Sequence, residues 1–130
     1  MIERPRVNNF FGEEPFHQED GLVRWRYVVR AEHFNPVGAL HGGVLSTLLD
    51  GVQGHALWTR IVEQGAFSAA ITLNVNFLGA TREAGRTLTF EGRVLQVGKR
   101  VAFTEGVAAD DTGRVVARAT CTHALIRKTS

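Results

Sequence analysis

The chain has 130 residues, 44% of them hydrophobic, and no break in composition, which fits a single domain over residues 1–130 with a modest core. Its formal charge of +2 at pH 7 comes from 15 basic and 13 acidic residues that are interspersed, so nucleic acid is not expected to be the main partner. The single cysteine excludes an internal disulfide, and no leader segment follows Met1, so we expect a cytoplasmic protein. No apolar run approaches the roughly 20 residues that span a bilayer, so we do not expect the chain to enter the membrane.

The N-terminal part of the chain contains an irregular segment and then a strand pattern. The first 20 residues combine charges, two prolines and the pair Phe10-Phe11 without a clear period, and we expect residues 1–20 to form an arm with at most one short helical turn. From Leu22 onward, apolar and basic residues alternate, which is typical of a half-buried strand. Pro36 and Gly38 end this strand before the next element begins.

Residues 42–62 carry a long helical pattern. The apolar residues recur at spacings of one, three and four, which places one stripe along a helix; they are Val44, Leu45, Leu48, Leu49, Val52 and Ala56. Asp50 points away from that stripe, among small residues. Gly51 and Gly54 each cost roughly 1 kcal/mol in a helix relative to Ala, so we expect another backbone or a ligand to come close there. Gly65 is placed to stop the helix.

Four later segments have strand patterns, namely residues 69–77, 87–97, 101–109 and 114–126. The first of these alternates an apolar set with polar residues; the apolar set is Ala69, Ile71, Leu73, Val75 and Phe77. The connection at Gly98-Lys99 has the spacing of a hairpin. We therefore predict a two-layer α+β domain in which a five-stranded antiparallel sheet wraps the helix. The Asp50 flank of that helix would stay open, which predicts at least a dimer.

The helix start and the residues before it form one recognisable segment, Asn35-x-x-Gly38-x-x-His41-Gly42-Gly43, followed after six residues by Asp50. This segment resembles the hotdog-fold acyl-CoA thioesterases, in particular the PaaI-type (phenylacetate-pathway) branch of the 4-hydroxybenzoyl-CoA thioesterase superfamily. Further matching stretches are residues 73–78, 98–100 and 113–119. The resemblance implies a hotdog fold, a homodimer with sheets joined edge to edge and active sites between the subunits, and often a homotetramer. It also implies an acyl-CoA substrate with no metal and no cofactor, because coenzyme A is part of the substrate.

By resemblance, four residues carry the chemistry. Asp50 falls where the family has its catalytic carboxylate, which can attack the thioester carbon or take a proton from water; both roles stay open. Asn35 falls where members have an Asn or Gln that orients the water or the carboxylate. Gly42 falls where a backbone N–H is offered to the thioester oxygen, which agrees with the unpaired N–H groups of a helix N-terminus. For His41, holding this loop and touching the substrate are both open.

Four more residues are candidates for substrate binding. Gly43 leaves room for the thioester carbonyl beside the helix start. Lys99 and Arg100 would contact the phosphates of coenzyme A, or else form a solvated turn. Phe77 would line an apolar pocket, or else belong to the core, and the same choice applies to Trp58, Phe67 and Leu78.

Several other polar residues have a more ordinary interpretation. Ala70 falls where some members of the family carry a Ser or Thr that assists the water, so this help must come from Ser68, Thr72 or solvent. Cys121 is expected to be a small buried hydrophobe. The remaining histidines show no metal-ligand spacing and are expected to be structural or surface groups; they are His17, His33, His55 and His123.

Two other functions are compatible with a hotdog fold, a hydratase or dehydratase and a non-catalytic acyl-CoA binding or sensing module. The hydratases resemble this chain less, because their histidine precedes a different loop, and a pure sensor would not need Asp50. A serine hydrolase is disfavoured because no Gly-x-Ser-x-Gly segment surrounds Ser46. The identity of the acyl group and the choice between dimer and tetramer stay open.

Overall fold

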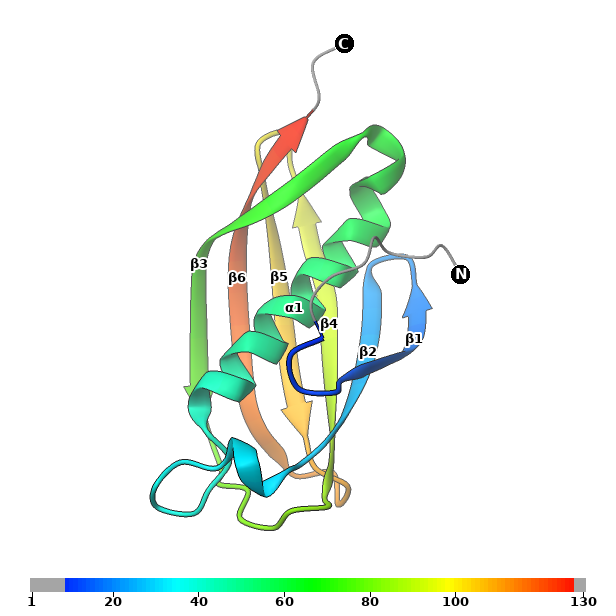
Figure 1. Cartoon of the computed structure of the whole chain (residues 1–130). Helices are drawn as coiled ribbons and strands as arrows, with labels where there is room; N and C mark the ends of the chain where they lie inside the picture. Colours follow the sequence, from blue (N-terminus) through cyan, green and yellow to red (C-terminus); the bar gives the residue numbers. More distant parts are fainter. Residues whose placement is uncertain (1–8, 128–130) are drawn as a thin grey trace.

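The computed structural model describes residues 9–127, which form one antiparallel sheet with one long helix lying across it (Figure 1). In chain order the elements are β1 (Glu14–Glu19), β2 (Leu22–Val28), the 3-10 helix η1 (Ala31–His33), α1 (Gly42–Ile61), the 3-10 helix η2 (Val62–Gln64), β3 (Ala66–Phe77), β4 (Thr87–Val97), β5 (Val101–Ala109) and β6 (Val115–Arg127). No helix within residues 9–127 is long and apolar enough to cross a membrane.

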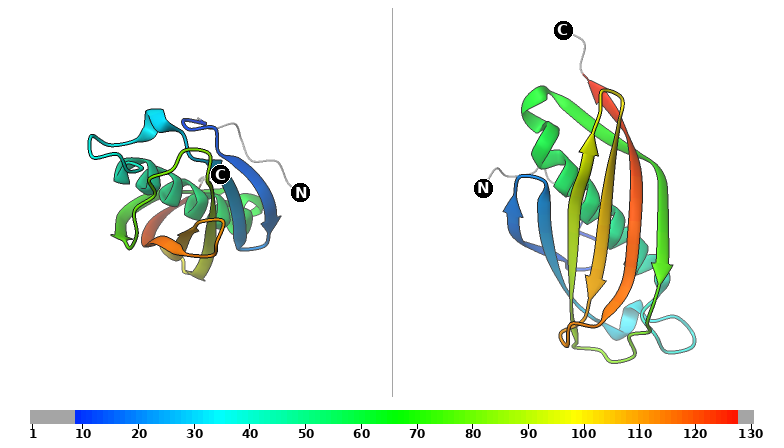
Figure 2. Two further views of the ribbon diagram at one scale, coloured as in Figure 1. Left: turned by 90° about the horizontal axis from the view of Figure 1, so that it is seen from below. Right: turned by 180° about the vertical axis from the view of Figure 1, so that it is seen from behind.

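The six strands follow the order β1-β2-β4-β5-β6-β3, and every neighbouring pair is antiparallel. β4, β5 and β6 make the meander that the short connections predicted. β3 returns from the end of α1 to the far edge of the sheet, where it pairs with β6 (Figures 1 and 2). The expected α+β hotdog architecture, in which one sheet curls around one central helix, is confirmed.

The sheet has a strand that the sequence pattern did not predict. Residues 14–19, expected to be part of an arm, form β1, which pairs with β2. Pro15 is tolerated there because β1 is an edge strand, in which a missing N–H can face away from the partner. The register also shifts between Pro15 and His17, and these irregularities hide the period of the strand. The expectation of five strands was therefore wrong; the described part of the arm, residues 9–20, holds no helix, and residues 1–8 lie outside the described range.

α1 begins where the sequence predicted and ends one residue early. Its N-cap is His41, whose Nδ1 accepts a hydrogen bond from the N–H of Gly43. After Ile61 a 3-10 turn follows, and Gly65 closes it in the left-handed conformation, with φ of 67°. The predicted apolar stripe is buried along its whole length; its members are Val44, Leu45, Leu48, Leu49, Val52 and Ala56.

α1 lies close against the sheet at Val52 and Gln53, where the facing strands carry glycine. A Cβ on Gly92 of β4 would overlap the backbone carbonyl of Val52. A Cβ on Gly106 of β5 would lie 3.1 Å from the side-chain nitrogen of Gln53. The two glycines thus allow the backbone and side chains of the helix to rest directly on the sheet.

Gly51 and Gly54, the two glycines in the interior of α1, have different surroundings. A Cβ on Gly51 would lie 2.6 Å from the ring of Trp25, so the close neighbour there is an aromatic side chain of β2 and not the backbone or ligand that we expected. A Cβ on Gly54 would meet nothing within 4 Å. Gly54 therefore leaves open space beside the helix, one turn after Asp50.

A bulge in β3 changes which of its residues face the helix. The register of β3 against β6 skips Ile71. As a result Ala70, which pairs with the buried His123, faces α1, whereas Ile71 is 59% exposed. Simple alternation, which placed Ile71 on the buried face, was wrong at this point. Ser68, two residues before Ala70, faces the helix as well.

Candidate active site

The N-terminus of α1 presents a backbone N–H that no described residue uses. The N–H of Gly43 donates to His41 Nδ1 at 2.8 Å, and the N–H of Val44 donates to the His41 carbonyl at 3.0 Å. Within residues 9–127, the N–H of Gly42 has no hydrogen-bond partner. A free N–H at a helix start carries partial positive charge and can polarise a carbonyl oxygen. Gly42 thus has the geometry of an oxyanion donor, while His41 caps the helix and occupies the Gly43 amide.

The side chain of Asn35 holds the loop that leads into α1. Its Oδ1 accepts hydrogen bonds from the N–H groups of Val37 and Ala39, each at 3.1 Å. Gly38, whose φ of 82° favours glycine, donates its N–H to the Asn35 carbonyl at 3.0 Å. The Nδ2 of Asn35 has no partner in the part of the chain that the structure describes. Its protons therefore stay available to a ligand or to a second subunit.

Asn35 and Gly42 face a pocket of about 430 Å³, here called the N-terminal pocket, between the start of α1 and the end of β3. The ring of Phe77 lies over Gly42, since a Cβ at that glycine would be 3.2 Å from the ring. Phe77 is 55% exposed and the adjacent Leu78 is 58% exposed, so neither belongs to the core. The pocket thus combines a free N–H, a free amide and an exposed aromatic ring.

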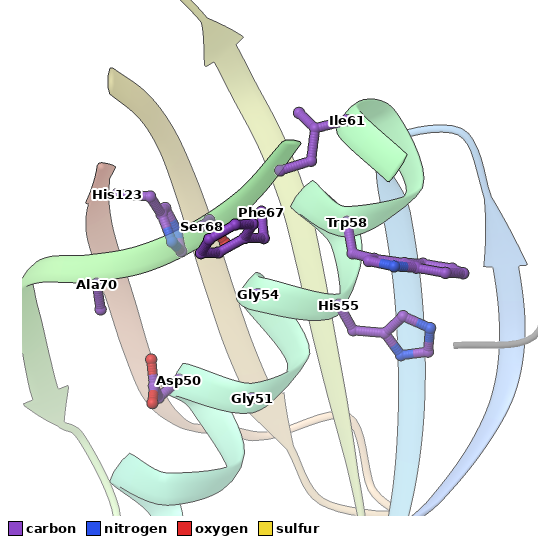
Figure 3. Close-up of a pocket in the computed structure, with 10 residues that line it drawn as sticks. All are labelled: Asp50, Gly51, Gly54, His55, Trp58, Ile61, Phe67, Ser68, Ala70 and His123. Atoms are coloured by element: carbon purple, nitrogen blue, oxygen red, sulfur yellow. The ribbon is translucent and has the colours of Figure 1, made fainter. Parts of the chain in front are cut away.

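Asp50 lies in a second pocket of about 350 Å³, here called the Asp50 pocket (Figure 3). Asp50 itself is exposed and projects from α1 toward β3. Further along the helix the walls are apolar, from Trp58 and Ile61, and Phe67 adds a ring from β3. The pocket therefore places one carboxylate at the end of a largely apolar space.

Ser68 places a side-chain hydroxyl in the Asp50 pocket, where Ala70 has none. Both residues line the Asp50 pocket, because the bulge turns them toward α1. Thr72, the other side-chain hydroxyl that the sequence left open, lies beyond the bulge and does not line the pocket. Of the three sources considered for assisting the water, Ser68 is the side chain that shares a pocket with Asp50.

The charge of Asp50 acts on two buried groups of β6. Burial, and to a smaller extent the Asp50 carboxylate, raise the pKa of the Cys121 thiol to about 11. Burial lowers the pKa of His123, and the Asp50 carboxylate opposes this in part. Cys121 is therefore the inert buried thiol that the sequence predicted.

The other described histidines pack and bond within the fold. His33 lies 2.6 Å from the Tyr27 hydroxyl, and His55 accepts a hydrogen bond from the Trp25 indole at 3.0 Å. Residues 9–127 contain no group of three His, Cys, Asp or Glu side chains that could hold a metal ion. His33 and His55 thus have hydrogen-bond partners within the fold.

The structure separates the predicted site residues into three groups. The N-terminal pocket is lined by Asn35, Gly42 and Phe77, and the neighbouring His41 and Gly43 bond to each other beside it. Asp50 is eight residues beyond Gly42 on α1, about 12 Å at 1.5 Å per residue. Lys99 and Arg100 are exposed at the tip of the β4–β5 hairpin, at the end of the sheet away from the start of α1 (Figure 1). A single chain thus holds the carboxylate and the free N–H at separate points along one helix.

Sequence comparison finds relatives named as thioesterases. The sequence profile of the family described as the thioesterase superfamily matches residues 37–117. The human protein acyl-coenzyme A thioesterase 13 is 32% identical to the chain over 99 residues, which cover 75% of this chain and 69% of that protein.

Solved structures share the fold. A protein of Streptococcus pneumoniae described as a thioesterase, solved with coenzyme A, has a TM-score of 0.80 and 25% identity, covering 91% of this chain and 88% of that one. The PaaI protein of the phenylacetic acid degradation operon of E. coli has a TM-score of 0.83 and 24% identity, covering 92% of this chain and 83% of that one. At that identity the likeness to PaaI shows the fold alone.

Replacing Asn35 tests whether its side-chain hydrogen bonds stabilise the loop that leads into α1. Asn35→Ala removes the acceptor of two backbone N–H groups, so we expect the free energy of unfolding to fall by about 1 kcal/mol. Asn35→Asp keeps an oxygen at the Oδ1 position, and its stability should stay within about 0.5 kcal/mol of wild type. Urea denaturation of the three proteins measures both changes. If Asn35→Ala were as stable as wild type, the side chain would not be what holds this loop.

Proposed function

The chain belongs to the thioesterase superfamily, and on this basis we propose that it hydrolyses acyl-coenzyme A thioesters to a free acid and coenzyme A. The observation that carries the proposal is the exposed Asp50 carboxylate at a largely apolar pocket, on the same helix whose N-terminal N–H is free. A human relative named as an acyl-coenzyme A thioesterase and a bacterial relative solved with coenzyme A support this substrate class.

In this proposal each active site forms between two copies of the chain. The reacting carbon must lie about 3 Å from the attacking oxygen, and its carbonyl oxygen must reach the donor N–H. Asp50 and Gly42 of one protomer are too far apart along α1 to meet both demands. β3 offers the joining surface, because it is a 12-residue edge strand with Phe67 and Ile71 half exposed. The functional unit is therefore a homodimer.

A two-fold axis near Leu73 of β3 would bring the two halves of each site together. Phe77 lies over Gly42, and Ser68 and Ala70 line the Asp50 pocket. In an antiparallel pairing centred on position 73, position 77 of one strand lies opposite position 69 of its partner, since both are four residues from the centre. The start of α1 in one subunit then faces the Asp50 pocket of the other.

Hydrolysis can follow two routes, and both use ionised Asp50. In the first, the carboxylate attacks the thioester carbon, the C–S bond breaks to release the thiolate of coenzyme A, and water cleaves the anhydride. In the second, Asp50 takes a proton from water as the water oxygen adds to that carbon, the C–S bond of the tetrahedral intermediate then breaks, and the proton passes from Asp50 to the departing thiolate. The Gly42 N–H stabilises the oxyanion in both routes, and the Ser68 hydroxyl and the Asn35 amide orient the water. Single turnover in isotopically labelled water marks the Asp50 carboxylate only in the first.

The rest of the substrate has sites of its own. The Asp50 pocket takes the acyl group, because Trp58 and Phe67 give it apolar walls and Gly54 leaves it open. Lys99 and Arg100 contact the phosphates of coenzyme A from the exposed hairpin tip. The proposed chemistry draws on side chains and one backbone amide, with coenzyme A entering only as part of the substrate.

A panel of acyl-CoA thioesters tests this function. We expect release of free thiol with apolar acyl groups, whereas loss of enoyl absorbance without thiol would indicate a hydratase, and binding without turnover a sensing module.

A matched acyl-pantetheine, which lacks the nucleotide phosphates, tests the proposed role of Lys99 and Arg100. It should show a higher KM at similar kcat, because these two residues lose their partners. An equal KM would remove these two residues from the substrate site.

Asp50→Asn tests the catalytic assignment. The change keeps the size of the side chain but removes its negative charge, so we expect kcat to fall by about 10²–10⁴ with little change in KM. Glu63→Gln is the matched control, because it removes an exposed carboxylate just beyond the same helix and should leave kcat unchanged. If correctly assembled Asp50→Asn protein hydrolysed its best substrate within about threefold of wild type, another group would have to be the nucleophile or base.

A further inference from the structure

A chain of hydrogen bonds crosses the core from β6 to α1. His123 Nε2 lies 2.8 Å from Thr104 Oγ1, and Thr104 Oγ1 donates to Gln53 Oε1 at 2.8 Å. Gln53 Nε2 then donates to the carbonyl of Leu49 at 3.0 Å. All three side chains are buried, with His123 only 2% exposed. Both ends meet the proposed site, because Leu49 precedes Asp50 in the helix and His123 lines the Asp50 pocket (Figure 3).

The partners determine where each proton of this chain lies. The Leu49 carbonyl only accepts, so the Gln53 amide turns its NH₂ group toward it and its oxygen toward Thr104. Thr104 donates its one hydroxyl proton to that oxygen and must accept from His123. His123 therefore carries a proton on Nε2, so its neutral form is the Nε2–H tautomer, and its Nδ1 faces Cys121 Sγ at 3.9 Å. Burial, which lowers the pKa of His123, favours the same neutral form.

The hydrogen-bond chain reaches α1 at Gln53, where the helix lies close against the sheet. Gly106 lies under the Gln53 amide, and Gly92 lies against the backbone of Val52. These contacts stop α1 from moving toward the sheet, and the hydrogen bond from Gln53 to the Leu49 carbonyl holds the peptide that leads into Asp50. The height of Asp50 above the sheet is thereby fixed.

Stability alone does not account for such a chain. Apolar side chains of similar shape would fill the same space at equal or lower free energy in many proteins, because desolvating polar groups offsets most of what their hydrogen bonds contribute. A fully satisfied polar chain, in contrast, permits one arrangement of the elements that it joins. Its effect here is to set the position of α1 relative to β5 and β6.

We infer that His123 is a positioning residue for hydrolysis, which acts through Thr104 and Gln53 to hold Asp50 at one distance from the β6 wall of its pocket. The inference rests on the proposed function, in which Asp50 attacks the thioester or activates water. What the site needs from His123 is the Nε2–H donor and not a positive charge.

Variants along the chain test this inference by their kinetics. His123→Leu removes the donor, and Thr104→Val removes the middle link while keeping its shape; we expect kcat to fall about 10- to 100-fold in each, with KM nearly unchanged. His123→Gln places an amide N–H near the Nε2 position and should stay within about threefold of wild type. Thr122→Val is the control, because Thr122 lies next to His123 on the opposite face of β6, outside the hydrogen-bond chain, and its kcat should match wild type.

The pH dependence of stability gives a second readout. Three titratable side chains lie around His123. Asp50 and His55 line the same pocket from α1, and Cys121 lies on β6 with His123. The residues that face His123 from β3 and β5 do not titrate; they are Ser68, Ala70 and Thr104. Burial lowers the pKa of His123 in the folded state, so the unfolded chain binds more protons and wild type loses stability as the pH falls through about 6.5. The His123→Gln protein should lose less stability over the same pH range, because glutamine does not titrate.

Folded His123→Leu and Thr104→Val proteins with wild-type kcat would overturn the inference, and so would a His123→Gln protein as slow as His123→Leu. If His123→Leu does not fold, Thr104→Val decides. Nitrogen NMR of the His123 ring reports its tautomer without any substrate. An Nδ1–H tautomer would break the chain and overturn the inference, whereas a wild-type protein that released no thiol from any acyl-CoA would instead overturn the proposed function.

Discussion

α1 carries both the free N–H of Gly42 and the carboxylate of Asp50, and the rise of an α-helix separates these two residues by about 12 Å along the helix axis. Loop motion cannot change this spacing, because both groups are on one continuous helix whose apolar stripe is buried against the sheet. In the proposed mechanism, a thioester that needs both groups at once therefore uses the helices of two subunits. The exposed edge of β3, which runs beside the helix, supplies a means of bringing a second helix near.

Local sequence patterns predicted most of the fold. The apolar stripe, the His41-Gly42-Gly43 start and Gly65 placed α1 within one residue, and the short connections placed the meander of β4, β5 and β6. β1 was missed because Pro15 and a register shift interrupt its period. The bulge at Ile71 was missed because an extra residue leaves no local signal and becomes visible only against the register of the partner strand.

The candidate site was predictable to the extent that its residues are close in sequence. The segment from Asn35 to Asp50 is continuous, and its spacing on a loop and helix determines much of its geometry. Ser68 reaches the Asp50 pocket only because of the bulge, and His123 only because β6 lies beside β3. A tertiary contact also explains Gly51, because the absence of a side chain there makes room for Trp25, which is 26 residues earlier in the chain.

Mixed dimers test most directly whether two helices build one site. Gly42→Pro removes the N–H at the first helical position, where the backbone accepts proline and the extended conformation of His41 suits a following proline. The Phe77 ring, 3.2 Å from a Cβ at position 42, must shift slightly to make room, and it is exposed enough to do so. Asp50→Asn and Gly42→Pro proteins should each be nearly inactive, because every site lacks one group. Refolded together in equal amounts, half of the dimers should be mixed and should hold one intact site, so about a quarter of wild-type activity should return. A mixture no more active than its components would contradict the account and place both groups in the same protomer.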